Sequence, residues 1–427
     1  MATERKKRKI RLFKFNKSKP KKDNNKERPP KPRKPKKETE VNEYEQTPGS
    51  KLKVINGTRK RNRIIRFVVY AIILAIVIAL IIINIMTPTG IVEALQNAYN
   101  AMGEGTYPVS VYSTNALNYT DYNGMQGVVN ESFFELYNSE GKLIQAVSHG
   151  MSKPQLEVSE ARYLLYDRDR YTVSVYNYGD ELYTLELENA IMAADIGRDG
   201  TFAVVTDSKT YQSTVNVYNK DNEVEFTWNS ANYYVTDVAV ADDGERIAVS
   251  LINANGGAFE SFVYILEFGN AEPIYRYKFN DIVSSLTSCG ENYLVANGFD
   301  CAFSVPWNSG AEHDLKISGI VRCYDFELNG ASVIISGRED NAQINTVTVI
   351  NAFGSVATSF EFNAAVNDVC INETLIAVLT DNEVYVYDHL GNAVKTVKSS
   401  VKGDFVGLSV EGDIYVLDSS KLISLEQ

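Results

Sequence analysis

The feature that most constrains this chain is a repeat with a period of about 40 residues that begins near Tyr107. One recurring piece is an apolar pair followed by Asn or Asp, a Gly-bearing turn and a second strand, as in LYNSEGKLIQAV and VYDHLGNAVKTV. Successive copies are offset by 39, 42, 48, 41, 43 and 37 positions, with markers at Tyr137, Tyr176, Tyr218, Leu266, Trp307, Ile350 and Tyr387. A period of this length with four strands per unit is typical of the blades of a β-propeller.

Each unit of the repeat contains two hairpins, which allows the units to be counted. The hairpin described above comes second, and the first consists of an alternating strand, a polar turn and a short apolar strand. The earlier hairpin occurs eight times and the later one seven times, so the final unit lacks its fourth strand. A ring left open there would expose a free sheet edge. The segment YPVSV at 107–111 would supply that strand. We therefore predict an all-β, eight-bladed propeller over 107–427 closed by an N-terminal strand, with seven blades as the alternative.

A second constraint lies before the repeats. Positions 67–86 carry no charge, and Asn84 is their one strongly polar side chain. At about 1.5 Å per residue, a helix of this length crosses a hydrocarbon core of about 30 Å. A cleavable secretory signal has a short basic start, whereas this apolar run begins only at Phe67. We predict a single transmembrane helix over 67–86 that is retained as an anchor.

Charge on the two sides of this helix predicts its orientation. Residues 1–66 contain 25 Lys or Arg against seven Asp or Glu, whereas the chain after them contains 18 basic and 47 acidic residues. Basic flanks stay in the cytoplasm. The membrane-orienting cluster in the juxtamembrane segment 59–66 consists of Arg59, Lys60, Arg61, Arg63 and Arg66. We expect a single-pass protein of the cell membrane with a cytoplasmic N-terminus and an extracellular C-terminal domain.

The composition of residues 1–58 predicts a disordered, basic cytoplasmic tail. They hold six of the chain's 11 prolines and very few apolar residues, so no core can offset the entropy of ordering them. Anionic lipid is the partner that such a polybasic segment favours. A cytoplasmic acidic partner is the alternative. Nucleic acid is not favoured, because only Phe13 and Phe15 place aromatic rings among the basic residues.

Between the anchor and the repeats, residues 87–106 indicate a short helix and a linker. Thr89 is a candidate N-cap and Gly103 a stop. One stripe of the helix carries Leu95, Ala98, Tyr99 and Met102. We expect the helix to pack on the domain that follows, and a plain spacer is the alternative.

No motif in the chain carries recognisable chemistry. The histidines, His149, His313 and His389, lie far apart in the sequence, and no Cys-x-x-Cys or His-x-x-x-His pair indicates a metal. Ser-x-x-Lys occurs at 139–142 and 399–402, but in turn regions rather than on the helix that this acyl-transfer motif requires. We predict no catalytic residues, no cofactor and no metal, and hence a protein that is not an enzyme.

Other clusters favour structural interpretations. The acidic runs at 166–170 and 242–245 are typical of solvated hairpin turns rather than calcium or acid–base sites. Packing between sheets, rather than a sugar platform, is indicated by the recurrence of Tyr137, Tyr176, Tyr218 and Tyr387. We assign no glycan to the Asn-x-Ser/Thr triplets that begin at Asn118, Asn130 and Asn372.

The chain has four cysteines, Cys289, Cys301, Cys323 and Cys370. So few over a domain of this length do not indicate a disulfide framework. Each lies in or beside an apolar run, which favours buried free thiols. The three possible pairings of four cysteines stay open at this point.

The order of these elements resembles that of a known bacterial family. A basic tail, a single anchor and a short helix precede the YPVSV segment, the LYNSEGK turn, the RYLLYD strand and the VTDVAVADDGERIAV hairpin. In this order the chain resembles the family catalogued as domain of unknown function 5711, over the anchor and the whole repeat region. The resemblance implies a membrane-anchored, propeller-like envelope protein, mostly of Gram-positive bacteria. It carries over no functional residues, because the family has no established activity.

Two functions follow as hypotheses. A rigid ring beside a membrane, without recognisable chemistry, favours a non-catalytic binding or scaffolding module at the bacterial cell envelope. Its partner would be an envelope protein or a cell-wall component, and the acidic outer part favours a basic patch on that partner. The alternative is a hydrolase or other enzyme acting on an extracellular saccharide or cofactor in the propeller funnel. Its catalysts would be paired carboxylates from separate blades, which local motifs cannot reveal.

Overall fold

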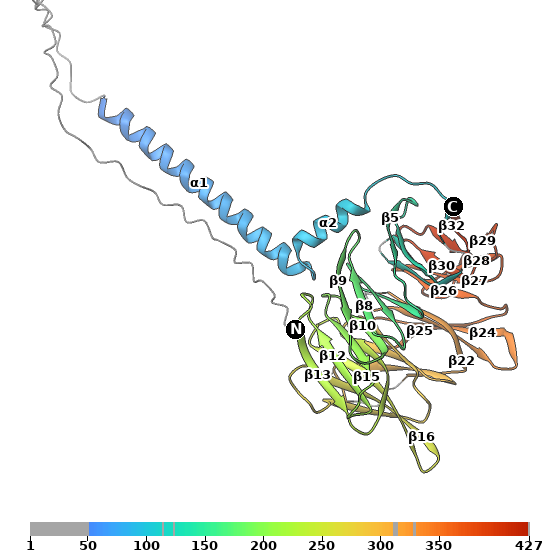
Figure 1. Ribbon diagram of the computed structural model, residues 1–427. Coiled ribbons are helices and arrows are strands. Elements are labelled where there is room, and N and C mark those ends of the chain that lie inside the picture. Colours follow the sequence, from blue (N-terminus) through green and yellow to red (C-terminus); the bar gives the residue numbers. More distant parts are fainter. Residues whose placement is uncertain (1–50, 113–114, 123, 311–314, 328–329, 426–427) are drawn as a thin grey trace, which may run out of the picture. The chain divides into compact units, whose positions relative to one another are not determined.

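The structure is a computed structural model that describes residues 51–112, 115–122, 124–310, 315–327 and 330–425 (Figure 1). Residues 1–50 of the expected tail and His313 lie outside the described residues. The described residues form two helices followed by 32 strands.

The strands in this part of the chain form eight sheets of four strands, which are the blades of a β-propeller. Seven blades use four consecutive strands each, and the eighth combines β30, β31 and β32 with β1. The prediction of eight blades rather than seven is therefore confirmed. In chain order the strands are β1 (Val109–Ser110), β2 (Ala116–Tyr122), β3 (Met125–Asn130), β4 (Phe133–Tyr137), β5 (Leu143–Ser148), β6 (Pro154–Val158), β7 (Tyr163–Asp167), β8 (Thr172–Tyr176), β9 (Glu181–Glu186), β10 (Ile191–Ile196), β11 (Phe202–Thr206), β12 (Ser213–Tyr218), β13 (Val224–Ser230), β14 (Tyr234–Val240), β15 (Arg246–Asn255), β16 (Ala258–Glu267), β17 (Tyr275–Phe279), β18 (Ser285–Cys289), β19 (Tyr293–Asn297), β20 (Cys301–Pro306), β21 (Leu315–Ser318), β22 (Ile320–Phe326), β23 (Ser332–Arg338), β24 (Asn341–Ile350), β25 (Val356–Phe362), β26 (Asp368–Ile371), β27 (Leu375–Leu379), β28 (Glu383–Asp388), β29 (Ala393–Lys398), β30 (Phe405–Leu408), β31 (Ile414–Leu417) and β32 (Lys421–Leu425).

The eighth blade closes the ring. β1 pairs antiparallel with β32, with Val109 opposite Leu422 and Ser110 opposite Lys421. The N–H of Val111 continues this pairing and donates to the carbonyl of Ser420 at 3.1 Å. The first strand of the domain therefore covers the edge of the last strand, as predicted for the YPVSV segment.

The Asn or Asp that recurs in the repeats has a local role in the turns. In the β4–β5 turn, the Oδ1 of Asn138 accepts hydrogen bonds from the N–H groups of Glu140 and Lys142, at 3.1 and 2.8 Å. Gly141 supplies the positive φ of 79° that this turn requires. The same side-chain-to-backbone turn is made by Asn177, Asn219, Asn351 and Asp388. This turn chemistry is why the repeat is visible in the sequence.

The hydrophobic core lies between adjacent blades. One buried cluster joins blades three and four, and its members include Val205, Val217, Val238 and Val249. Burying an apolar side chain of this size contributes about 1.5–3 kcal/mol, so each interface between blades depends mainly on the hydrophobic effect. The recurring tyrosines belong to these interfaces, since Tyr137, Tyr176 and Tyr218 are buried and Tyr387 packs against a buried cluster. The interpretation of sheet packing is confirmed.

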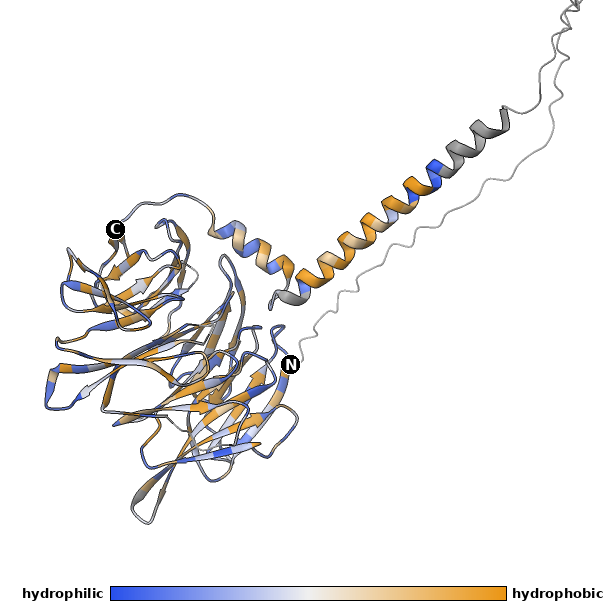
Figure 2. Cartoon of the chain, turned by 180° about the vertical axis from the view of Figure 1, so that it is seen from behind, coloured by the Kyte–Doolittle hydropathy of each residue, from blue (hydrophilic) through white to orange (hydrophobic). Residues whose placement is uncertain are grey.

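α1 (Lys51–Met86) carries the apolar segment. Its stretch Arg61–Asn84 has 24 residues and a mean hydropathy of 3.1, and none of it is buried. Figure 2 shows this stretch as almost continuously apolar. By length and composition it is the one candidate transmembrane helix among the described residues. Residues 51–58, which we expected in the disordered tail, lie within α1.

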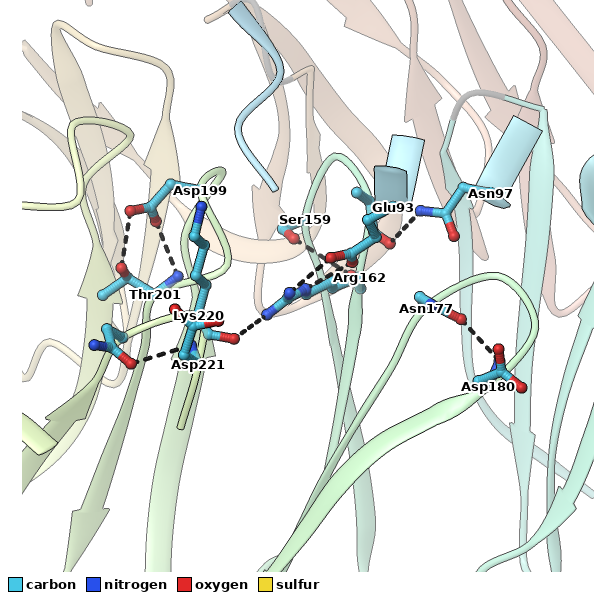
Figure 3. A network of polar contacts seen from close by, with 12 residues as sticks. Glu93, Asn97, Ser159, Arg162, Asn177, Asp180, Asp199, Thr201, Lys220 and Asp221 are labelled. Atoms are coloured by element: carbon cyan, nitrogen blue, oxygen red, sulfur yellow. Dashed lines mark hydrogen bonds and ion pairs between the residues drawn. The ribbon is translucent and has the colours of Figure 1, made fainter. Parts of the chain in front are cut away.

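α2 (Ile91–Ala101) follows α1 after a short connection and docks on turns of the first two blades (Figure 3). Its N-cap is Gly90 rather than the expected Thr89, and Gly90 has no side chain to cap this end. At the other end, the amide of Asn138 donates to the carbonyl of Ala101 at 2.8 Å. This bond satisfies one of the carbonyls that a helix leaves free at its C-terminus.

Two buried polar side chains hold α2 in place. Arg162, in the β6–β7 turn, donates to both carboxylate oxygens of Glu93 at 2.8 Å, a bidentate ion pair that is strong and directional (Figure 3). One turn along the helix, Asn97 donates to the carbonyl of Ala161 and accepts the N–H of Tyr178, each at 3.1 Å. Arg162 and Asn97 are each only 5% exposed, so both contacts are shielded from water.

The apolar side of α2 faces away from the propeller. Val92, Leu95, Tyr99 and Met102 are between 65% and 77% exposed. The expectation that the helix packs on the following domain is confirmed, but the stripe containing Leu95 and Tyr99 is not the packed side. The docking surface consists of turns whose backbone groups and charged side chains need polar partners, so the polar side of the helix binds there.

Replacing Val111 with Pro should destabilise the propeller, because it removes the N–H that donates to Ser420 at the ring closure. A buried group left without its partner costs about 1–3 kcal/mol. We expect the melting temperature of the full-length chain in detergent, followed by circular dichroism, to fall by several degrees. Val410→Pro is the matched control, because Val410 is exposed in a turn outside the strands. An equal fall in both variants would contradict the closing role of β1.

Candidate functional site

The first strands of six blades line a cavity at the centre of the ring. β2, β6, β10, β14, β18 and β22 contribute residues to this central cavity, whose volume is about 390 Å³. Five carboxylates contribute to its lining, and they are Glu157, Asp195, Asp237, Asp242 and Asp325. The two basic lining residues are Arg168 and Arg198. The central cavity is therefore an acidic site built from many blades.

The repeat itself places these carboxylates. Glu157, Asp195 and Asp325 each stand two residues before the turn that ends their strand. Asp237 stands four residues before the corresponding turn of its blade. Side chains two residues apart share one face of a strand, so β6, β10, β14 and β22 carry their acidic groups on the same face.

Three of the cavity carboxylates tie neighbouring blades together. Asp195 accepts the N–H of Val240 at 2.7 Å, and Asp237 accepts the N–H of Leu286 at 2.7 Å. Asp325 makes the same kind of bond to the next blade at 2.8 Å. Each bond joins the first strand of one blade to the first strand of its neighbour. Hydrogen bonds to charged groups contribute about 1.5–3 kcal/mol each, so these side chains stabilise the centre of the ring.

Burial raises the pKa of these carboxyl groups, because the cavity solvates a negative charge poorly. The pKa rises from 3.8 to about 7 for Asp237 and to about 6 for Asp195, Asp242 and Asp325. The backbone N–H groups that bind Asp195, Asp237 and Asp325 oppose this rise in part. The acidic groups therefore take up protons close to neutral pH.

Glu157 differs from the three carboxylates that tie neighbouring blades together. None of the hydrogen bonds among the described side chains involves it, whereas Asp195, Asp237 and Asp325 each bind a backbone N–H. Burial raises the pKa of Glu157 well above its usual value, and the charges of Asp195 and Asp237 add to this effect. Glu157 is therefore a cavity carboxyl group with a raised pKa that no hydrogen bond from the described residues holds in place.

One rim of the cavity carries an ion pair and an unpaired oxygen. Arg198 pairs with Glu160 at 2.6 Å. The Oδ2 of Asp242 is buried and has no hydrogen-bond partner. In the same turn Asp243 pairs with Arg246. The interpretation of the 242–245 run as a solvated turn therefore suits Asp243 but is wrong for Asp242, which the fold turns toward the cavity.

The membrane-orienting cluster predicted from the sequence belongs entirely to α1. Arg61, Arg63 and Arg66 are exposed on this helix. Arg59 and Lys60 lie in the same helix, with side chains outside the described part of the structure. Their role in orientation stays a prediction.

The two described histidines hold loops in place. The Nδ1 of His149 accepts the N–H of Met151, and its Nε2 bonds the carbonyl of Asn130, each at 3.0 Å. Burial lowers the pKa of His149, which favours its neutral form. The Nε2 of His389 bonds the carbonyl of Asn372 at 2.8 Å. In the described part of the chain, no group of three or more His, Cys, Asp or Glu side chains could hold a metal ion.

The remaining motif residues also serve the fold. In the Ser-x-x-Lys matches, Lys142 donates to the carbonyl of Met102 at 2.6 Å, and Lys402 pairs with Asp381 at 3.3 Å. In the 166–170 run, Asp169 pairs with Lys153 at 2.6 Å, and both side chains are largely exposed. In the glycan triplets, Asn130 and Asn372 are buried, and Asn118 donates to the carbonyl of Leu156 at 3.5 Å.

The cysteines are free thiols. Cys289, Cys301 and Cys370 are buried and Cys323 is half-buried. Burial raises the pKa of Cys289 and of Cys301 to about 12, so both thiols stay protonated and unreactive at neutral pH.

The fold and the central cavity define an eight-bladed β-propeller with an acidic channel. The chain belongs to the Family of unknown function (DUF5711), whose sequence model matches residues 103–417. A search of curated proteins finds no match.

Solved structures with this fold are similar to the propeller at low sequence identity. BamB from Moraxella catarrhalis matches with a TM-score of 0.50 and 10% identity over 75% of this chain and 99% of that one. Sqt1 from Saccharomyces cerevisiae matches with a TM-score of 0.55 and 7% identity over 76% and 100%. The C-terminal WD40 domain of Sif2 matches with a TM-score of 0.51 and 12% identity over 76% and 100%. At these identities the likeness establishes the fold alone.

Reasoning from local motifs missed the central cavity, although the sequence holds a signal for it. An Asp followed by an apolar residue recurs in first strands, as at Asp195, Asp237, Asp325 and Asp368. If these Asp residues had been recognised as one recurring position of the repeat, they would have indicated a role that their blades share. Asp368 makes the same bond as the others, accepting the N–H of Val406 at 2.9 Å.

The raised pKa values predict that the propeller is more stable at pH 5.5 than at pH 8. The folded state takes up protons as the pH falls through 7 and 6, whereas unfolded Asp stays ionised until about pH 4. His149, with its lowered pKa, opposes this trend but is a single group. We expect the melting temperature of the full-length chain to rise by several degrees between pH 8 and pH 5.5.

Asp237→Asn tests the cause, because the amide oxygen can still accept the N–H of Leu286 without a charge. This variant should melt higher than the parent at pH 8 and show a weaker dependence on pH. Asp207→Asn is the matched control, since Asp207 is exposed and also accepts a backbone N–H. A parent chain that loses stability between pH 8 and pH 5.5 would contradict the interpretation.

Proposed function

We propose that this chain is a single-pass membrane protein whose propeller lies outside the cytoplasm and acts as a non-catalytic binding or scaffolding module at the bacterial cell envelope. The observation that carries the proposal is the use of the channel carboxylates as ties between blades. Asp195, Asp237 and Asp325 each accept a hydrogen bond from a backbone N–H of the next blade. Groups committed to holding the ring are poorly suited to changing partners during a reaction.

The anchor rests on the composition and exposure of α1. The stretch Arg61–Asn84 has no buried residue, and its exposed side chains are apolar on every side beyond Arg66. A soluble helix would need a polar face or a covering partner. A lipid bilayer satisfies such a surface, and the basic residues before the segment favour the cytoplasmic side for the N-terminus.

The charge of the propeller defines the chemistry of its partner. After Arg66 the chain carries 18 basic and 47 acidic residues, so its field attracts a partner with a basic surface. An envelope protein with a Lys- or Arg-rich patch, or a cell-wall component bearing amines, fits this requirement. The basic tail before the anchor would contact anionic lipid on the other side of the membrane.

An enzyme is the second candidate, and one observation favours it. Burial raises the pKa of Glu157, no hydrogen bond from the described residues holds its carboxyl group, and Asp195 and Asp237 lie in the same cavity. A proton donor beside an ionised carboxylate is the arrangement that glycoside hydrolysis uses. The purified full-length chain would then release sugars from envelope saccharides, and Glu157→Gln would abolish this release without disturbing the fold.

The topology can be tested with protease on intact cells. A chain with different peptide tags at its two ends should lose the C-terminal tag and keep the N-terminal one, because only the propeller side is accessible. Permeabilised cells provide the control in which both tags are lost. Loss of the N-terminal tag from intact cells would contradict the proposed orientation.

The binding role predicts a partner outside the cell. A membrane-impermeant, amine-reactive crosslinker on intact cells should join the full-length chain to an envelope protein or wall fragment. Capture should weaken as the salt concentration rises, because exposed charges are screened. A chain that captures nothing and instead hydrolyses a saccharide in a Glu157-dependent manner would replace the binding proposal with the enzymatic one.

A further inference from the structure

α2 presents an uncovered apolar surface. Val92, Leu95 and Tyr99 occupy one side of the helix, because residues three and four positions apart are neighbours on a helix surface, and Met102 follows as the C-cap residue. We call these four residues the outer stripe. Their exposed fractions are 75%, 65%, 77% and 66%, respectively. Large apolar side chains grouped in this way mark a contact surface when they are not covered.

The polar docking of α2 fixes the direction in which the outer stripe points. Glu93 is held by the buried Arg162, and Asn97 by Ala161 and Tyr178, all on the opposite side of the helix (Figure 3). Rotating the helix to bury the outer stripe would break these bonds and leave the Arg162 guanidinium, 5% exposed, without its carboxylate. Breaking a buried pair in this way is strongly unfavourable. The stripe is therefore held outward.

The chain also limits how far the outer stripe can lie from the end of α1. α1 ends at Met86 and α2 begins at Ile91. Five residue steps, even fully extended, cover at most about 18 Å. Ile91 is in addition tied back to α1, since its N–H donates to the Oδ1 of Asn84 at 3.4 Å. Whatever surface surrounds the end of α1 is within reach of α2.

We propose that the outer stripe lies in the headgroup boundary of the lipid bilayer and holds the propeller against the membrane. The proposal rests on the proposed function, in which α1 crosses the bilayer. An interfacial helix buries its apolar side about 5–10 Å into this boundary. Tyr99 suits it, because tyrosine is enriched where one end of a side chain is apolar and the other is wet. Glu93, the one charged residue of α2, points to the protein instead.

A second copy of the chain fits the outer stripe less well. A stable interface between proteins buries about 800 Å² on each partner, with some 20–30 residues a side. Three side chains on a helix of 11 residues and one at its C-cap provide much less. Contact with a bilayer requires no surface of complementary shape, and in the proposed function the bilayer surrounds the end of α1. We therefore assign the outer stripe to lipid. The turns of the first two blades that hold α2 would then face the membrane.

Quenching of tryptophan by brominated lipid tests the proposal. The full-length chain is reconstituted in phosphatidylcholine vesicles whose acyl chains carry bromine at carbons 6 and 7, and in unbrominated vesicles. The two native tryptophans, Trp228 and Trp307, are buried in the propeller and provide the baseline. In Tyr99→Trp, we expect bromine to lower the added emission at least twofold. Phe299→Trp is the matched control, because Phe299 is an aromatic residue 66% exposed in the β19–β20 loop.

A third variant separates failure of this inference from failure of the proposed function. Tyr70→Trp lies within the apolar stretch of α1 and should be quenched if that helix crosses the bilayer. If Tyr70→Trp is quenched and Tyr99→Trp is quenched no more than Phe299→Trp, the outer stripe does not contact lipid and the inference is wrong. If Tyr70→Trp is not quenched, the transmembrane anchor itself is wrong. An unquenched Tyr99→Trp in a chain that crosslinks to a dimer would assign the stripe to a second copy.

Discussion

The pairing of backbone groups at the ends of the ring is the constraint on which the rest of this structure depends. A row of eight sheets leaves one free edge at each end, and unpaired edge strands recruit other chains. β1 covers these edges by pairing with β32, although the two strands lie at opposite ends of the propeller's sequence. The closing strand follows closely after α2, so ring closure also brings α2 to the turns of the first two blades. Closure therefore determines both the rigid ring and the place where the helix docks.

Closure has a second consequence at the centre of the ring. It brings the first strands of the blades together, and with them a set of carboxylates that lie far apart in the sequence. Backbone N–H groups from neighbouring blades satisfy most of them, as Val240 does for Asp195. Burial then raises their pKa values, because the same proximity that supplies the N–H groups also excludes water. The carboxylates of the central cavity therefore serve largely to join the blades, and Glu157 and Asp242 are the two that make no such bond within the described part of the chain.

α2, the helix between α1 and the propeller, shows how a docking surface selects the side of a helix that it binds. The blades end in turns rich in carbonyls, N–H groups and charged side chains, which an apolar helix face could not satisfy. Arg162 and Asn138 bind the polar side and the end of α2. The apolar side is left for another environment, which we propose to be lipid because α2 lies close to the end of α1. The amphipathic pattern was therefore visible in the sequence, but which side would face the protein was not.

The sequence by itself determined the architecture. The repeat of Asn or Asp turns, the count of hairpins and the leftover YPVSV strand predict eight blades and their closure, because turn chemistry and strand alternation are local properties. The apolar run of α1 is equally local. Only the tertiary structure decided the site: Asp195 and Asp237 become a cavity because the ring brings separate blades together, and Asp242 turns inward although its run resembles a solvated turn. It also decided that Leu95 and Tyr99 face outward, because the buried partners of Glu93 and Asn97 come from turns that are distant in the sequence. The burial of a side chain and its hydrogen bonds to distant segments depend on the folded ring, so no short stretch of sequence determines them.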